Sequence, residues 1–217
     1  MAEKTTGKVK AHTIYKKTDG TRVPGVTTIL GVLNKPALVP WANRMGLQGI
    51  DTTKYVDEKA SIGTLAHEMI MAHICDEEVD FSDYTPNQIE LAENSILKYF
   101  DWEKEHLMTP IMVESPMVSE IMGYGGQIDL LCELDGVPTL VDFKTGGGIY
   151  KEMGYQLAAY TQLINESTGY ALESGRILRI GRSEDEGFEE RVYPNLGAYF
   201  EVFEHCLQIY QLQKLCK

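Results

Sequence analysis

The stretch IDLLCELDGVPTLVDFKTG, residues 128–146, sets two apolar runs on either side of an Asp135-Gly136 pair. Asp-Gly between apolar runs is a strong signal for a two-residue type I′ turn, so the stretch predicts a β-hairpin. In that hairpin residue 134 faces residue 137, and counting outward brings Asp129 opposite Asp142. The pair falls on a non-hydrogen-bonded position, where Cα atoms approach to about 4.5 Å. The hairpin therefore sets two carboxylates against each other.

Two opposed carboxylates repel, so this face of the hairpin needs a counterion or exposure to water. The period of two along a strand puts Lys144 on the same face as Asp142. The other face carries the apolar side chains Leu130, Cys132, Val141 and Phe143 and is expected to point into the core. Two interpretations remain open from the residues alone. Either a divalent cation binds between the aspartates, or Lys144 bridges them as a structural ion triad.

Polar groups up and down the chain can join this face. Gln156 and Tyr160 lie four residues apart, on one side of a predicted helix, and can lean over the strand ends. Glu114 interrupts an apolar strand in PIMVESPMV. His67 lies on a predicted helix with apolar neighbours, where a lone histidine is either a ligand or a satisfied core residue.

The rest of the chain alternates helices and strands, which predicts one α/β domain with a mixed sheet. A hairpin is expected around Asp19-Gly20, followed by two helical pieces interrupted by Pro36 and Pro40. TPNQIE predicts a helix start, with Thr85 as N-cap, Pro86 at the first position and Gln88 completing a capping box. The remaining expected elements are helices at about 53–75, 150–166 and from 195, and strands at 110–118, 126–134, 138–145, 176–182 and 188–194.

Composition limits the function classes. The chain has 217 residues, and its polar start and lack of an apolar run of about 18 residues predict neither a secretory signal nor a membrane segment. We therefore expect a cytoplasmic protein. The four cysteines, Cys75, Cys132, Cys206 and Cys216, lack C-x-x-C spacing, so reduced and mostly buried thiols are expected, without zinc or disulfides.

The net charge of −12 is unevenly distributed. Residues 1–60 hold ten basic and five acidic residues, a balance of +5, which leaves −17 for residues 61–217. A polyanion would meet the N-terminal quarter more favourably than the rest, although chance clustering on a solvated surface explains the split equally well. The basic candidates for phosphate contacts are Lys16, Lys17, Arg22, Lys35 and Arg44.

Five short motifs occur in a fixed order: GTLAH, VE, GGQIDLL, VDFKTG and YQLAAY, from about Gly63 to Tyr160. This ordered set resembles the PD-(D/E)XK nuclease superfamily, in particular its RecB-like exonuclease branch. Residues 23–46 also resemble the leader of small phage-encoded nucleases of this type. The resemblance implies a restriction-endonuclease-like core at 61–182, an N-terminal hairpin and helical extension at 1–60, and a C-terminal strand and helix at 183–217. Ile128 stands where the superfamily's name has proline.

The resemblance also implies roles for the site residues. His67, Asp129 and Asp142 would bind a catalytic Mg²⁺ or Mn²⁺, together with the main-chain carbonyl of Phe143. Lys144 would position or polarise the attacking water. Gln156 and Tyr160 would hold the lysine, the phosphate or the DNA strand. Glu114 would support a ligand or a second metal.

The function implied is a metal-dependent DNA exonuclease, encoded by a phage and acting in recombination, repair or genome processing in a bacterial host cell. A single-strand annealing or binding protein is the expected partner by family analogy. Two alternatives stay open: a structure-selective or restriction-type endonuclease, and a non-cutting nucleic-acid-binding domain. Too few cysteines follow Tyr160 for the iron–sulfur cluster of some members, and the chain has no G-x-x-x-x-G-K-[ST] motif of a helicase.

Overall fold

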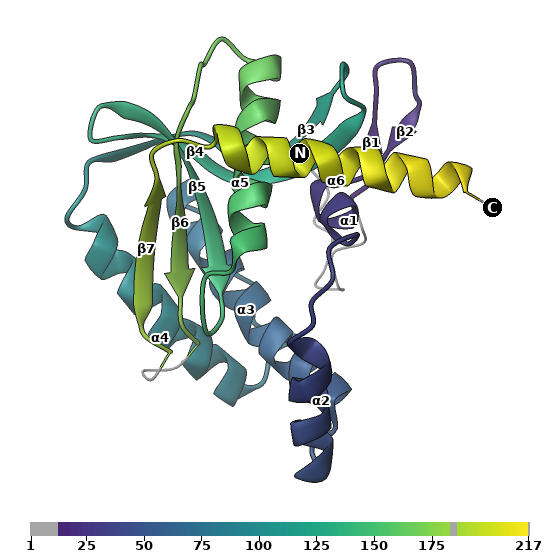
Figure 1. Cartoon of the computed structure of the whole chain (residues 1–217). Coiled ribbons are helices and arrows are strands. Elements are labelled where there is room, and N and C mark those ends of the chain that lie inside the picture. The colour runs from purple at the N-terminus through teal and green to yellow at the C-terminus, as the bar shows by residue number, and fades with distance from the viewer. Residues whose placement is uncertain (1–12, 183–185, 217) are drawn as a thin grey trace.

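A five-stranded mixed sheet forms the centre of the protein in this computed structural model, which describes residues 13–182 and 186–216. The strands follow the order β3 (Met108–Ser119), β4 (Tyr124–Leu134), β5 (Val137–Thr145), β6 (Gly175–Ile180) and β7 (Phe188–Tyr193), as Figure 1 shows. Neighbouring strands are antiparallel except β5 and β6, which are parallel. A parallel pair needs a crossover connection, and helix α5 (Lys151–Ser167) supplies it.

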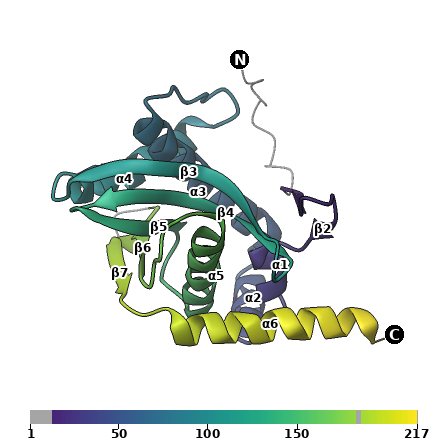
Figure 2. The same ribbon diagram turned by 90° about the horizontal axis from the view of Figure 1, so that it is seen from above.

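Helices cover both faces of the sheet (Figure 2). One face packs against α3 (Thr52–Cys75) and α4 (Pro86–Glu103), and it carries Leu130, Cys132, Val141 and Phe143 of the β4–β5 hairpin. The other face packs against α5, α6 (Gly197–Leu215) and the short α1 (Val26–Leu30). The prediction of an α/β fold with a central mixed sheet flanked by helices is confirmed, and the arrangement is consistent with a restriction-endonuclease-like core.

The predicted start of α4 is confirmed. Thr85 caps α4, with both hydrogen bonds of the capping box to Gln88 and with Pro86 at the start. The side chain of Asp51 accepts hydrogen bonds from the main-chain N–H groups of Thr53 and Lys54 at the start of α3. These caps satisfy N–H groups that have no partner within the helix.

The N-terminal hairpin, β1 (Tyr15–Lys16) and β2 (Arg22–Val23), docks on the start of β4. Its close approach requires Gly125, since a Cβ there would lie 2.4 Å from the ring of Tyr15. Helix α2 (Leu38–Leu47) follows, with Pro40 in its first turn. The predicted interruption at Pro40 is therefore wrong, because a first-turn residue needs no N–H donor within the helix.

All four cysteines are unpaired, but only Cys132 and Cys206 are buried, so the expectation of mostly buried thiols is wrong for the exposed Cys75 and Cys216. No helix within residues 13–182 and 186–216 combines the length and the apolar character needed to cross a membrane. The polar start on which the prediction of no secretory signal rests lies in residues 1–12, outside the described residues.

Candidate active site

The β4–β5 hairpin has the predicted register. Asp135 and Gly136 have φ angles of 52° and 82°, as a type I′ turn requires, and the ladder runs from Leu134–Val137 to Leu130–Val141. Asp129 and Asp142 are the next residues on the two strands. Here a side chain joins the strands, because the main-chain N–H of Phe143 donates a hydrogen bond to Oδ2 of Asp129 at 2.8 Å. The site therefore begins where the main-chain ladder ends.

Asp142 is a buried carboxylate with unused acceptor capacity. Only 1% of the residue is exposed, and no main-chain N–H group of the described residues donates a hydrogen bond to its carboxylate. Nζ of Lys144 lies 2.5 Å from Oδ2 of Asp142, so the ammonium supports this oxygen as an ion pair, while Oδ1 has no hydrogen-bond partner among the described residues. Burial raises the pKa of Asp142 to about 6, because the favourable charge of Lys144 only partly offsets desolvation and the repulsion from Asp129.

Asp129 has the opposite balance. Burial alone would raise its pKa, but the hydrogen bond and charge of His67, followed by Lys144 and the Phe143 amide, outweigh burial and hold the pKa below its usual value. Nε2 of His67 lies 3.3 Å from Oδ1 of Asp129. Asp129 is therefore an ionised carboxylate supported by His67 and a main-chain amide, whereas the support of Asp142 comes from Lys144.

Glu114 occupies a strained backbone position in the middle of β3. The β3–β4 register on either side places it opposite Asp129, and its φ of 44° lies in the left-handed region. Its Oε1 lies 3.8 Å from Nδ1 of His67, so the imidazole stands between two acids. A non-glycine residue in this conformation costs roughly 1–3 kcal/mol, and such strain gathers at functional sites.

Lys144 remains charged in this setting. Burial would lower its pKa, but the charges of Asp142 and Asp129 and the contact with Asp142 outweigh burial and raise it. The ammonium lies on one aspartate, while the other is held by His67 and a main-chain amide. This arrangement differs from a lysine that bridges both acids.

Gln156 and Tyr160 form a pair on α5, as their spacing predicts. Nε2 of Gln156 donates a hydrogen bond to Oη of Tyr160 at 2.8 Å. Burial, and then the negative charge of Asp142, raise the pKa of the Tyr160 phenol, so the hydroxyl keeps its proton beside the acids. The pair thus presents neutral polar groups to the site.

Two glycines of the sequence motifs are required by close packing. A Cβ at Gly126 would lie 2.5 Å from Cε1 of Tyr160, and a Cβ at Gly63 would lie 2.3 Å from Oγ1 of Thr145. Gly63 therefore lets α3 approach the end of β5, one turn before His67. The helix tolerates a poor helix former there because the contact needs the missing side chain.

Arg179 is a residue of the site's surroundings that sequence reasoning missed. It is buried on β6 beside Lys144, and its guanidinium donates hydrogen bonds to the main-chain carbonyls of Gly146 and Glu186 and lies near Glu189. It thereby anchors the glycine-rich loop between Lys144 and α5. The only sequence signal was a charge inside the apolar run RILRIGR, which a surface arginine explains equally well.

The chemistry of these side chains suits a hard divalent cation, because such ions prefer carboxylate ligands and Oδ1 of Asp142 has no hydrogen-bond partner among the described residues. As the groups stand, the described residues hold no cluster of three or more His, Cys, Asp or Glu side chains arranged as a cation site. Their positions are consistent with the ion pairs that His67 and Lys144 make with the acids. Binding would require His67 and Lys144 to shift away from those contacts.

Comparisons with known proteins add little to this geometry. No family model and no curated protein sequence matches the chain. Among solved structures, SSO0001 is similar at 14% identity with a TM-score of 0.36, covering 63% of this chain and 69% of that chain. A protein of Eubacterium rectale named "Putative exonuclease" is similar at 14% identity with a TM-score of 0.48, covering 71% and 66%. Likeness at this level carries no argument about activity, so the function rests on the site.

Proposed function

We propose that the chain is a metal-dependent deoxyribonuclease that hydrolyses phosphodiester bonds from DNA ends. One observation carries the proposal: the buried carboxylate of Asp142 stands opposite the ionised Asp129, pairs through Oδ2 with the Lys144 ammonium at 2.5 Å, and keeps Oδ1 without a hydrogen-bond partner among the described residues. A structural core gains little from this arrangement, since the desolvation of two acids and the repulsion between them offset the attraction of one lysine. The arrangement becomes useful when a cation and a phosphate occupy the site.

Mg²⁺ or Mn²⁺ would be held by Asp129, Asp142, His67 and the main-chain carbonyl of Phe143. The cation supplies Lewis-acid stabilisation of the charge that develops on the phosphate. Lys144, charged beside the two acids, would orient the attacking water and offset the negative charge of the scissile phosphate.

Second contacts would come from α5 and β3. Gln156 and Tyr160 would donate hydrogen bonds to the phosphate or the DNA strand, since both remain neutral. Glu114, whose backbone has the strained left-handed conformation within β3, would hold His67 in position. Gln156 and Tyr160 would thus bind the substrate, and Glu114 would orient a metal ligand.

The wider role proposed is that of a phage-encoded exonuclease in recombination, repair or genome processing, working in the cytoplasm of a bacterial host. A single-strand annealing or binding protein is the proposed partner. The support is the ordered set of sequence motifs and the leader at residues 23–46.

End-labelled linear duplex, linear single strand and covalently closed circular DNA, each incubated with Mg²⁺ or Mn²⁺, test the proposal. Loss of both linear substrates with an intact circle supports an exonuclease. Cutting of the circle indicates an endonuclease, and binding without cutting in either metal contradicts the proposal. Asp142→Asn serves as the inactive variant, and Asp101→Asn, which removes an exposed ion pair on α4, serves as the matched control.

A further inference from the structure

A helical arm projects from the domain. We use this name for α2 together with residues 48–60, the loop and the first turns of α3, at the lower end of the molecule in Figure 1. None of the residues of α2 is buried. Large apolar side chains cover the arm and are exposed by 37% to 81%: Leu38, Val39, Leu47, Ile50, Tyr55 and Val56. Several exposed apolar side chains on one projecting segment indicate a binding surface.

Aromatic rings and a cation meet on this arm. Trp41 of α2 and Tyr55 of α3 have ring centroids 6.3 Å apart at an angle of 53°. Nζ of Lys59 lies 5.9 Å from the centre of the Tyr55 ring. Partly exposed rings beside a lysine offer flat faces for bases and a charge for the phosphates between them.

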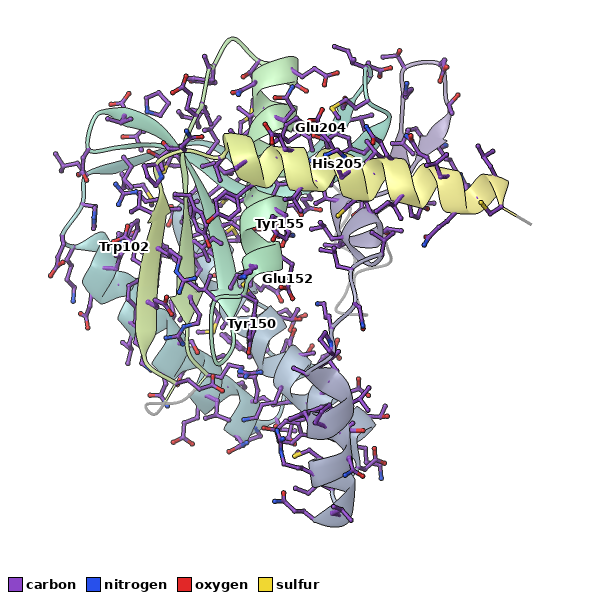
Figure 3. The ribbon with its side chains drawn as sticks, viewed as in Figure 1. Trp102, Tyr150, Glu152, Tyr155, Glu204 and His205 are labelled. Carbon is purple, nitrogen blue, oxygen red and sulfur yellow. The ribbon has the colours of Figure 1, made fainter. Side chains whose placement is uncertain are left out.

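The arm is continuous with the proposed active site. Val56, Gly63 and His67 follow one another along one side of α3, and Gly63 packs against Thr145, the residue after Lys144. From Val56 to His67 the helix rises about 16 Å. Lys35, before α2, forms an ion pair with Glu152 at 3.3 Å, and Figure 3 marks Glu152 at the start of α5. The segment that leads into the arm is thus tied to the first turn of α5, the helix that carries Gln156 and Tyr160.

The charge of the arm repels a polyanion less than the charge of the rest of the domain does. The arm, residues 38–60, carries three basic and three acidic residues and is therefore neutral overall. Residues 61–217 carry −17. A DNA strand that must reach the acids of the site thus meets less repulsion along the arm than across the remaining surface.

We propose that the arm is a stacking platform for single-stranded DNA, with Trp41 and Tyr55 holding bases of the strand that enters the site at His67. The inference rests on the proposed function for the identity of that site. Stacking needs bases free of a duplex, so the platform selects single strands or frayed ends. Loss of one stacked base weakens binding about 5- to 100-fold.

Tryptophan fluorescence tests the platform directly, because the chain has two tryptophans. Trp102 is buried on α4, far from the arm (Figure 3), whereas Trp41 is partly exposed on α2. A single-stranded oligonucleotide added in EDTA, which prevents cutting, is expected to quench the emission to saturation. Trp41→Phe should abolish the quenching while leaving the emission of Trp102.

Affinity measurements supply the second readout. Trp41→Ala and Tyr55→Ala should each weaken single-strand binding by about 5- to 100-fold and leave binding of a blunt duplex unchanged. Tyr210→Ala is the matched control, because Tyr210 on α6 also lies beside a lysine, with Nζ of Lys214 at 4.4 Å from the ring. Tyr210→Ala should keep the wild-type affinity.

Three results would overturn the platform: quenching that persists in Trp41→Phe, an equal loss of affinity in Tyr210→Ala, or a dimer of the free protein that buries Trp41. The last result would mean that a second copy covers the arm. Nuclease assays with Mg²⁺ or Mn²⁺ separate this inference from the proposed function. An active enzyme with an unresponsive Trp41 overturns the platform alone, whereas an inactive chain that binds through Trp41 supports the platform and contradicts the nuclease.

Discussion

Asp129 and Asp142 stand at opposing positions just beyond the β4–β5 ladder, and Asp129 accepts a hydrogen bond from a main-chain amide whereas Asp142 pairs with Lys144. Its pKa is lowered, whereas that of Asp142 is raised to about 6. Two chemically identical groups therefore affect the stability of the metal-free protein in opposite directions.

The first prediction follows from this difference. Asp129→Asn should lower the melting temperature in EDTA at pH 7.5, by about 2–10 °C, because it removes charge-assisted hydrogen bonds of roughly 1–3 kcal/mol. Asp142→Asn should melt no lower than the wild type. A loss of several degrees in Asp142→Asn would instead favour a structural ion pair with Lys144.

The pH dependence of this effect has a defined sign. The folded pKa of Asp142, about 6, exceeds the ordinary value of 3.8, so the folded state binds the proton more tightly than the unfolded chain. Ionisation of Asp142 therefore lowers the free energy of unfolding as pH rises from about 4 to 6. Melting curves at pH 5 and 7.5 should show the gain of Asp142→Asn shrinking at the lower pH, while the Asp129 contribution is lost only as pH falls below about 4.

A second prediction separates the metal ligands from the lysine. Mn²⁺ should raise the melting temperature of the wild type, because a ligand that binds only the folded state stabilises it. Lys144→Ala should keep this increase and lose most turnover, whereas His67→Ala should weaken metal affinity and regain some activity at high Mn²⁺. Unchanged affinity and rate in His67→Ala would identify His67 as a core histidine.

A third prediction uses the left-handed backbone of Glu114. Glu114→Gly and Glu114→Ala both remove the carboxylate, but only glycine adopts a φ of 44° without strain. The glycine variant should therefore be more stable than the alanine variant by about 1 kcal/mol, with equally reduced activity. Urea unfolding of both variants measures the difference, and equal stabilities would mean that the backbone relaxes elsewhere.

A fourth prediction concerns the glycine beneath Tyr160. Gly126→Ala should cost about 1–3 kcal/mol, because the added Cβ would lie 2.5 Å from the tyrosine ring and force Tyr160 to move. Gly169→Ala is the control, since no atom lies within 4 Å of a Cβ at that position. The melting temperature and the cleavage rate should both be lower in Gly126→Ala and unchanged in Gly169→Ala.

A fifth prediction tests the basic N-terminal quarter. Lys17 and Lys35 are engaged with the Glu120 carbonyl and with Glu152, so the exposed Lys16, Arg22 and Arg44 are the available candidates for phosphate contacts. Removing one real contact should reduce the slope of log affinity against log salt by about one unit on duplex DNA in Ca²⁺. Arg176→Ala, on an arginine already paired with Glu190, should keep the wild-type slope.

Local sequence signals were enough to predict the hairpin that carries the two aspartates. The Asp135-Gly136 turn alone placed Asp129 opposite Asp142, because a two-residue turn fixes every pair of the hairpin. The difference between the two acids could not be predicted in this way. It depends on His67 and on the Phe143 amide, and thus on how a distant helix and the end of the ladder meet in the folded chain. The strain at Glu114 likewise has no local signal.

The two-residue turn also restricts how the hairpin can change in length. Surface loops ordinarily accept insertions at small cost. A residue added to either strand between the turn and the acids would reverse the faces of everything beyond it. Asp142 would then point into the apolar cluster beneath α3 and α4, and Phe143 would point into the site. The number of residues between the two aspartates is thus as much a part of the site as the aspartates themselves, although none of the intervening side chains carries a charge that the chemistry uses.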